Sequence, residues 1–431
     1  MRTLLANCEI LDPEKGKRFW GFVEWEDGII TTVKRAGPGM VDEPDGIKVI
    51  DGRGHLLTPS FVDLYADFCE PGNESREDVA SGSAAAAAGG YTTVCISPDT
   101  SPVIDGADTA RFVLERAARA GLIDVKPLGA LSKNLAGESM AEIGEMAEAG
   151  VIALCEADKY ITRTGFLRRC MEYGTNFRLP ILLTSEDPTL ASGMAHEGFV
   201  STIRGLKATP AAAEEAAVAR HVALAELTGA QTHLLKISSA AAVRIVKDAK
   251  KRGVQVTASV TAHHLALTEQ SVAGWDPAAK VWPPCRSEED RKALLAGLAD
   301  GTIDAIVSDH APRSIEDKEL EFDLAVPGAS AIELVWPILN RLVLAEELDI
   351  VIALRALALA PRRLLGLPGG SITAGSPADL VLLDRAAPWT LDRAGLVSSS
   401  KNSPFMGNSF AGRTEMTVRG GKVTFARSGG R

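Results

Sequence analysis

The chain has 431 residues, of which 46% are hydrophobic and 24% are charged, and its net charge is −10 at pH 7. This composition is typical of a globular protein with a sizeable core, and the negative charge argues against nucleic acid or an anionic membrane as a partner. No apolar run reaches the roughly 18 residues of a membrane span, and the first residues lack the apolar core of a signal peptide. Six cysteines without a Cys-x-x-Cys pair favour reduced thiols, so we expect a cytoplasmic protein.

Both ends of the chain are expected to be rich in β-strands. Short apolar segments begin at Thr3, Gly21 and Ile29, and Asp27-Gly28 between the last two is a hairpin signal. Residues 378–384 and 416–425 show the same pattern of strands and turns near the other end.

Between these ends, short apolar strands alternate with helical stretches, which indicates repeated βα units. The expected strands begin near Phe61, Thr92, Val125, Val151, Pro180, Thr232, Val256 and Asp304. The clearest helical patterns cover residues 211–227 and 240–251. Eight βα units predict an α/β fold with a TIM barrel over residues 58–369, whose active site would lie at the carboxyl ends of the strands.

The segment 61–72, with the sequence FVDLYADFCEPG, is an apolar run that breaks at Glu-Pro-Gly. It is therefore expected to be a buried strand that presents Tyr65, Asp67 and Cys69 to a loop. Together with GHLLTPSFVD at residues 54–63, it resembles the first barrel strand of the dihydroorotase family of the amidohydrolase superfamily, where the corresponding sequence is PGFIDLHVHLREPG. The resemblance continues at residues 82–94, 287–291, 300–304 and 400–405. It implies a TIM barrel and a composite β-sandwich built from residues 1–57 and 370–431.

The positions that match the family's metal ligands have lost their histidines. A binuclear zinc site needs imidazoles and carboxylates that converge on one point. Tyr65 and Asp67 replace the histidines after strand one, whereas Thr184 and Lys236 replace those after strands five and six. Carboxylates remain at Glu156, within Glu-Ala-Asp after strand four, and at Asp309, within Ser-Asp-His-Ala-Pro after strand eight. The resemblance makes Asp309 the retained catalytic position, with His310 beside it, and the sequence predicts no metal site.

The positions that match the family's substrate contacts have changed as well. Cys69 replaces an arginine, Asp99 an asparagine, Trp282 another asparagine and Arg313 a histidine. A carboxylate at Asp99 would repel the carboxylate of dihydroorotate.

Lys236 offers a physical reason for the loss of the metal. Without a metal ion, Asp67, Glu156 and Asp309 would gather negative charge in the barrel mouth, which is costly unless a cation compensates. We therefore expect the Lys236 ammonium to take the place of the metal and to pair with Asp309 or Glu156. The alternative is that Lys236 simply reaches water.

Within the family, the chain is most similar to non-catalytic dihydroorotase-like chains that associate with aspartate carbamoyltransferase. That resemblance implies an inactive homologue in pyrimidine biosynthesis without a cofactor, part of a homo- or hetero-oligomer with the transferase catalytic chain as partner. One alternative is an active dihydroorotase or other cyclic amide hydrolase with a rebuilt site for zinc or a harder ion on Asp67, Glu156 and Asp309. Another is a sensor that binds a small ligand in the barrel mouth.

Overall fold

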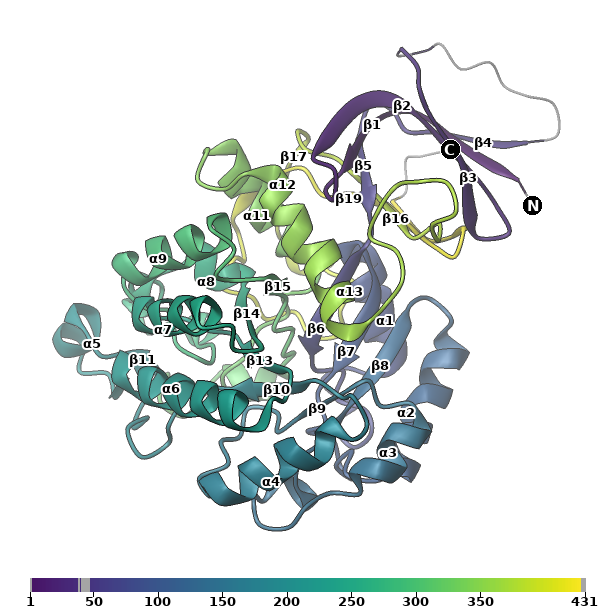
Figure 1. Ribbon diagram of the computed structural model, residues 1–431. Helices are drawn as coiled ribbons and strands as arrows, with labels where there is room; N and C mark the ends of the chain where they lie inside the picture. The colour runs from purple at the N-terminus through teal and green to yellow at the C-terminus, as the bar shows by residue number, and fades with distance from the viewer. Residues whose placement is uncertain (1, 38, 40–46, 428–431) are drawn as a thin grey trace.

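The computed structural model describes residues 2–37, 39 and 47–427. Residues 1, 38, 40–46 and 428–431, which belong to the predicted terminal domain, lie outside the described part. Figure 1 shows a barrel surrounded by helices and, at one end of it, a curved β-sheet near which both termini lie. Within the described residues, no helix is both long and apolar enough to cross a membrane.

The barrel consists of eight parallel strands whose neighbours follow the order β15-β14-β13-β10-β9-β8-β7-β6. They are β6 (Phe61–Ala66), β7 (Tyr91–Ile96), β8 (Asp124–Ala130), β9 (Ala153–Cys155), β10 (Ile181–Thr184), β13 (Thr232–Leu235), β14 (Val256–Thr261) and β15 (Ala305–Val307). Each predicted strand is present. The strands are apolar almost throughout because the barrel interior covers one face and helices cover the other. The predicted TIM barrel is thus confirmed.

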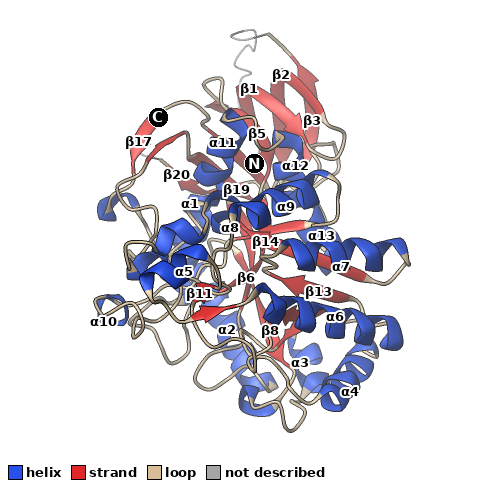
Figure 2. Cartoon of the chain, turned by 90° about the vertical axis from the view of Figure 1, so that its left-hand side faces the viewer, coloured by secondary structure: helices blue, strands red, loops and turns tan. Residues whose placement is uncertain are grey.

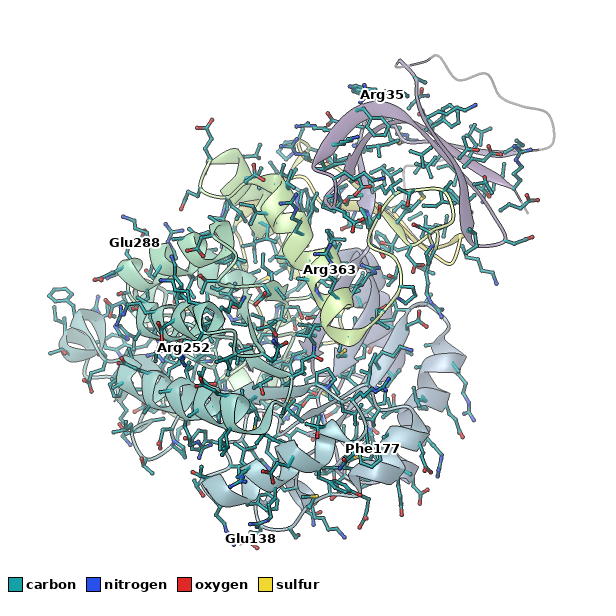
Figure 3. The ribbon with its side chains drawn as sticks, viewed as in Figure 1. Arg35, Glu138, Phe177, Arg252, Glu288 and Arg363 are labelled. Carbon is teal, nitrogen blue, oxygen red and sulfur yellow. The ribbon has the colours of Figure 1, made fainter. Side chains whose placement is uncertain are left out.

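Helices form the outer ring of the barrel (Figure 2). They are α1 (Val79–Gly89), α2 (Ala107–Ala120), α3 (Ile143–Ala149), α4 (Thr164–Thr175), α6 (Ala211–Thr228), α7 (Ala240–Lys251), α8 (Ala262–Ala266), α9 (Glu288–Ala299), α11 (Val335–Leu344), α12 (Ile350–Leu354) and α13 (Ala360–Leu365). The two helices predicted most clearly are α6 and α7. Helix α7 buries Ala242, Val246 and Ala249, which share one face at helical spacing. Charged side chains such as Glu138 and Glu288 project outward (Figure 3).

Strands from both ends of the chain form a second sheet in the order β20-β19-β16-β5-β1-β2-β3, with β4 beside β1. They are β1 (Thr3–Asp12), β2 (Lys17–Glu26), β3 (Ile29–Arg35), β4 (Lys48–Asp51), β5 (Leu56–Pro59), β16 (Leu380–Leu383), β19 (Thr414–Arg419) and β20 (Lys422–Ala426). The predicted β-rich domain from both termini is therefore confirmed, and hydrogen bonds join its strands in one continuous sheet. A smaller pair, β17 (Pro388–Thr390) and β18 (Ser409–Ala411), lies apart from it. The predicted boundaries at residues 57/58 and 369/370 stay a prediction.

The barrel and the terminal sheet meet at the end of α1. Gly90 ends this helix with a φ of +97°, which disfavours any residue with a side chain. A Cβ at Gly90 would lie 3.0 Å from both the Phe61 ring in the barrel and Val381 in the sheet. Thr417 Oγ1 in β19 also donates to the carbonyl of Ala87 at 2.7 Å. The two parts are thus packed directly against each other.

The barrel closes between its first and last strands. The Asp67 N–H donates to the His310 carbonyl at 2.7 Å. The Ser308 N–H donates to Asp63 Oδ1 at 3.1 Å, and Ala66 and His310 form a parallel bridge. The motif 308–312, which follows the eighth strand and resembles the family pattern, therefore lies where the first and last barrel strands meet. We call this junction the seam.

We expect Asp63→Ala to lower the free energy of unfolding by about 2–3 kcal/mol, because the buried Ser308 N–H would lose its acceptor. Denaturant unfolding followed by circular dichroism measures this change. Asp63→Asn keeps an acceptor oxygen and should lose less than half as much. If the Ala variant were as stable as the parent, the Asp63 carboxylate would not stabilise the contact between the first and last barrel strands.

Candidate functional site at the barrel mouth

Four residues that follow barrel strands have a left-handed backbone. The φ angles are +59° at Cys69, +53° at Ala157, +56° at Lys236 and +49° at Asp309. Such angles are found in only a few per cent of non-glycine residues and cost on the order of 1 kcal/mol each. Strain of this kind clusters where surrounding structure fixes a side chain in a particular direction. The backbone is thus bent sharply at four points around the barrel mouth.

The Lys236 ammonium lies at the floor of the mouth between two carboxylates. Lys236 Nζ is 2.8 Å from Asp309 Oδ1 and 2.6 Å from Asp158 Oδ1. It also lies 4.8 Å from the centre of the Tyr65 ring, within the range of a cation–π contact. The Lys236 side chain is 0% exposed. The pairing expected between Lys236 and Asp309 is therefore present, and Lys236 does not reach water.

Lys236 keeps its positive charge despite its burial. Burial on its own would lower the pKa of Lys236, but Asp158 and Asp309 together raise this pKa above its ordinary value. A buried ammonium ion is tolerated only when its desolvation is offset by ion pairs and hydrogen bonds. Two charge-assisted hydrogen bonds and an aromatic face supply that compensation here.

The expectation that Glu156 lies at this floor was wrong. Glu156 turns toward the loop after β8, where it accepts from the backbone N–H groups of Leu131 at 3.0 Å and Ser132 at 3.1 Å. The left-handed Ala157 reverses the chain between Glu156 and Asp158, so the second acid of Glu-Ala-Asp faces the mouth. Asp158 is the carboxylate that completes the Lys236 pair.

The remaining positions that match metal ligands are engaged in contacts within the protein. Thr184 Oγ1 donates to the Ala157 carbonyl at 2.9 Å and thereby supports the turn that presents Asp158. Asp67 Oδ1 accepts from the Cys69 N–H at 2.9 Å, and its Oδ2 lies 3.8 Å from Arg313 Nη1. Asp67 is therefore directed toward Arg313. Burial raises the pKa of the Cys69 thiol, which keeps it protonated and poorly suited to bind a metal.

His310 does not face the mouth, although it follows Asp309 directly. Its Nδ1 accepts from the Ala331 N–H at 3.1 Å, so the ring proton lies on Nε2, which points at Glu77 Oε2 3.5 Å away. His310 is 1% exposed. The Asp309 side chain thus points toward Lys236, whereas His310 contacts the residues that join the first and last barrel strands.

The mouth opens into a cavity of about 540 Å³ above the floor. The predicted substrate positions Asp99, Trp282 and Arg313 line this cavity together with Asp158 and Asp309. The structure therefore brings most of the altered substrate positions to one place. Cys69 is buried beside Asp67 and does not line the cavity.

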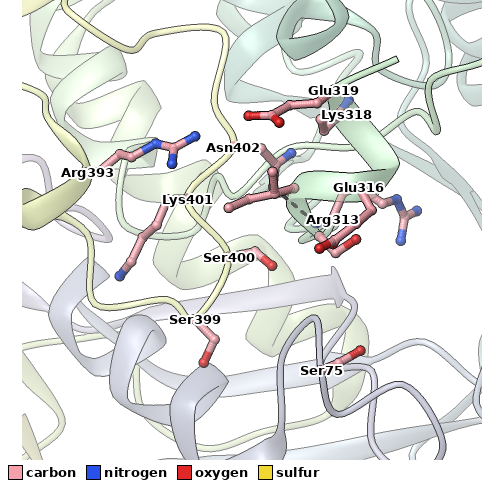
Figure 4. A pocket seen from close by; sticks show the side chains of 12 residues that line it. Ser75, Arg313, Glu316, Lys318, Glu319, Arg393, Ser399, Ser400, Lys401 and Asn402 are labelled. Atoms are coloured by element: carbon pink, nitrogen blue, oxygen red, sulfur yellow. Dashed lines mark hydrogen bonds between the residues drawn. The ribbon is translucent and has the colours of Figure 1, made fainter.

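A second cavity of about 270 Å³ lies beside α10 (Ile315–Lys318) and the loop 399–402. Figure 4 shows Arg393 on one side of it and Glu316 and Glu319 on the other, with Ser399 and Ser400 below. Carboxylates and cations thus both line this cavity, which gives it no clear preference for a charged ligand. Among the predicted site residues that the structure describes, Arg313 is the one that lines it.

Sequence reasoning missed two features of the mouth. His263, after β14, places its Nε2 3.8 Å from Asp309 Oδ2, and burial lowers the pKa of His263 so that the ring is neutral. Beside the cavity, Arg286 Nη2 pairs with Glu186 at 3.2 Å, and burial raises the pKa of Glu186 to about 8. The signal available for His263 was its place directly after a barrel strand. Arg286 gave no comparable signal because it lies in a loop.

The residues at the floor do not fit a metal ion. Zinc requires at least three ligands from His, Cys, Asp or Glu side chains. No group of three or more such side chains within residues 2–37, 39 and 47–427 is arranged to hold a metal. A divalent ion between Asp158 and Asp309 would meet the Lys236 ammonium at the same point. Asp158 and Asp309 thus bind the Lys236 ammonium at the point where a metal ion would lie.

Comparison with known proteins agrees with this fold and with the sequence motifs. The sequence profile of the family described as Dihydro-orotase-like matches residues 54–242. A dihydroorotase of Anaeromyxobacter dehalogenans strain 2CP-C is 44% identical over 405 residues, which cover 92% of this chain and 94% of that protein. A dihydroorotase of Geobacter sp. strain M21 is 40% identical, with 99% of each chain covered.

Solved structures of hydantoinases have the same fold. The L-hydantoinase (dihydropyrimidinase) of Arthrobacter aurescens gives a TM-score of 0.86 at 23% identity, covering 98% of this chain and 95% of that one. The D-hydantoinase of a Thermus species gives 0.82 at 22% identity with the same coverage. The sequence matches to dihydroorotases cover more than nine tenths of the chain at 40–44% identity. They show that the chain belongs to the dihydroorotase family of the amidohydrolase superfamily, and the fold of the hydantoinases agrees with this.

Proposed function

We propose that this chain is a non-catalytic, cytoplasmic member of the dihydroorotase family that acts in pyrimidine biosynthesis as a structural component. The observation that carries this proposal is the fully buried Lys236 ammonium between Asp158 and Asp309. It compensates part of the negative charge of the floor, but an ammonium ion has no open coordination position at which a water could bind and have its pKa lowered, as at a catalytic metal.

The cavity wall supports the same proposal. Asp99 adds a third carboxylate to the cavity that Asp158 and Asp309 line, which is unfavourable for an anion such as dihydroorotate. The cationic Arg313, which could have countered this charge, donates through Nε to the Pro327 carbonyl at 2.7 Å and lies near Asp67. The cavity wall carries more carboxylates than cations: Asp99, Asp158, Glu186 and Asp309 against Arg313 and the exposed Lys159.

We further propose that the partner is the catalytic chain of aspartate carbamoyltransferase. This part rests on the resemblance to non-catalytic dihydroorotase-like chains that assemble with that enzyme. Lys236 compensates part of the negative charge of Asp158 and Asp309 without a metal ion, which suits a structural role.

The competing candidate is an active dihydroorotase, and the specific observation that favours it is the naming of relatives up to 44% identical as dihydroorotases. In that case zinc would have to bind, and the Lys236 ammonium would have to leave the floor or lose its proton. Activity measurements separate the two candidates.

The purified chain should show no hydrolysis of dihydroorotate, either with added zinc or with added manganese. The assay follows ring opening and closure with an active dihydroorotase as the positive control, and metal content is measured on the same samples. Turnover above background that disappears in Asp309→Ala would overturn the proposal and establish a rebuilt active site.

Lys236→Met should lower the free energy of unfolding by about 3 kcal/mol at pH 8, because Asp309 would remain buried without its cation. The loss should be smaller at pH 5. Burial raises the pKa of an unpaired Asp309 above its value in the unfolded chain, so the variant loses stability as the pH rises through that range.

The matched control for this variant is Lys247→Met, which removes an ion pair with Asp300 that lies on the surface. Surface pairs contribute about 1 kcal/mol or less, so this control should change little at either pH. If Lys236→Met were as stable as the control, the ammonium would not be the charge that stabilises the floor.

When this chain and the aspartate carbamoyltransferase catalytic chain of the same organism are mixed, they should elute together in size-exclusion chromatography. Asp309→Ala should not weaken the complex, because the proposed role requires the surface of the barrel and no chemistry at its mouth. Separate elution at micromolar concentrations of both chains would refute this partner.

A further inference from the structure

Loops that follow separate barrel strands form the wall of the mouth cavity. Asp99 follows β7, Asp158 follows β9, Glu186 follows β10 and Trp282 follows β14, while Asp309 lies at the seam. The cavity volume of about 540 Å³ falls within the range of pockets that hold small organic molecules. The mouth is therefore large enough for a ligand, and the charge and shape of its wall indicate which kind.

The cations of the mouth compensate its carboxylates only in part. Lys236 serves both Asp158 and Asp309, each through one oxygen. Burial raises the pKa of Asp309 although Lys236 opposes the rise, and the charge of Asp158 adds to it. Arg313 lies near Asp67. The carboxylate of Asp99 is exposed and forms no hydrogen bond or ion pair within the described ranges.

The floor already binds an ammonium ion through carboxylates and an aromatic ring, those of Asp158, Asp309 and Tyr65. The open side of the cavity offers the same kinds of group. The Asp158 side chain is 41% exposed, and its Oδ2 accepts no hydrogen bond from a residue that the structure describes. Trp282 lines the cavity, and its ring has no stacking or cation–π partner among those residues. The cavity therefore suits a second ammonium ion.

A buried atom without a partner faces the same carboxylate. His263 is 2% exposed, and its Nε2 has no hydrogen-bond partner in the part of the chain that the structure describes. This atom lies 3.8 Å from Asp309 Oδ2. Buried polar atoms are nearly always hydrogen-bonded, so an orphaned one calls for a partner. A ligand ammonium bound to Asp309 Oδ2 has further N–H groups, and one can be donated to Nε2 when the ring proton lies on Nδ1.

We propose that the mouth cavity binds a small organic ammonium ion, a protonated primary amine attached to a flat apolar group. The ammonium binds the free oxygens of Asp158 and Asp309, so that two carboxylates and two ammonium ions balance each other with Lys236. The flat group packs against Trp282 and the apolar part of the wall. This inference goes beyond the proposed function and rests on it in one respect, namely that Lys236 and no metal ion occupies the floor.

The wall of the cavity is fixed before a ligand arrives. The Gly328 N–H donates to the Lys280 carbonyl at 2.9 Å, which joins the loop that carries Pro327 to the loop that carries Trp282. Lys280 Nζ also donates to the Phe322 carbonyl at 2.7 Å. A wall held in this way loses little conformational freedom when a ligand binds.

The first test is isothermal titration calorimetry at neutral pH with benzylamine as the probe. Benzyl alcohol and benzoate serve as controls, because they carry the same ring with no charge and with a negative charge. Benzylamine should bind with a Kd on the order of 1 mM, which is ordinary for a ligand of its size. Benzyl alcohol should bind at least about tenfold more weakly, since it lacks charge-assisted hydrogen bonds, and benzoate should not bind measurably.

The second test places the amine in the mouth. Asp99→Asn should weaken benzylamine binding about threefold, the effect of losing one exposed charge near the ligand. The matched control is Glu319→Gln, which removes the same charge from the second cavity and should leave the affinity unchanged. Ala191→Phe fills the mouth cavity without changing any charge and should abolish binding. Circular dichroism verifies that each variant is folded.

Two outcomes overturn the proposal. One is a metal-free chain that binds benzylamine no better than benzyl alcohol. The other is a folded Ala191→Phe variant that binds benzylamine as tightly as the parent, since the amine must then bind elsewhere. Both outcomes leave the proposed function standing. Failure of the proposed function is seen separately, as metal bound to the purified chain or as hydrolysis of dihydroorotate.

Discussion

The arrangement of carboxylates at the barrel mouth depends on one buried ammonium ion, that of Lys236. Asp158, which is partly exposed, and the buried Asp309 converge on the Lys236 ammonium, and two carboxylates so placed would repel each other without a cation. Lys236 supplies that cation from a neighbouring strand end, with both hydrogen bonds under 3 Å. A covalently attached ammonium compensates one of these two negative charges, whereas a divalent metal ion would compensate both, and it brings no coordination sites. A single lysine can therefore compensate part of the negative charge at this site.

In the motif after β15, two adjacent residues make different contacts. The Asp309 side chain pairs with Lys236, while the backbone and ring of His310 join β15 to β6 and to the segment that contains Ala331. Both residues thus have a structural task. The backbone of this motif contributes to barrel closure.

Much of the fold could be predicted from the sequence because buried parallel strands are apolar throughout and their helices have a different period. A pairing of Lys236 with Asp309 or Glu156 could also be predicted, because carboxylates gathered in the barrel mouth require a cation. Glu156 could not be placed. Which acid of Glu156-Ala157-Asp158 faces the mouth depends on the left-handed backbone at Ala157, and an alanine gives no signal for that conformation.

Buried lysines also hold the loops that follow β14 and β15. Loops at the mouth of an active barrel must admit substrate and release product, which favours movable segments. Here the ammonium groups of Lys280 and Lys318 bind backbone carbonyls of neighbouring loops and replace that freedom with fixed contacts. Burial lowers the pKa of Lys318 to about 7, so its desolvation is only partly offset by those carbonyls. Fixing these loops therefore requires a buried ammonium whose desolvation is incompletely compensated.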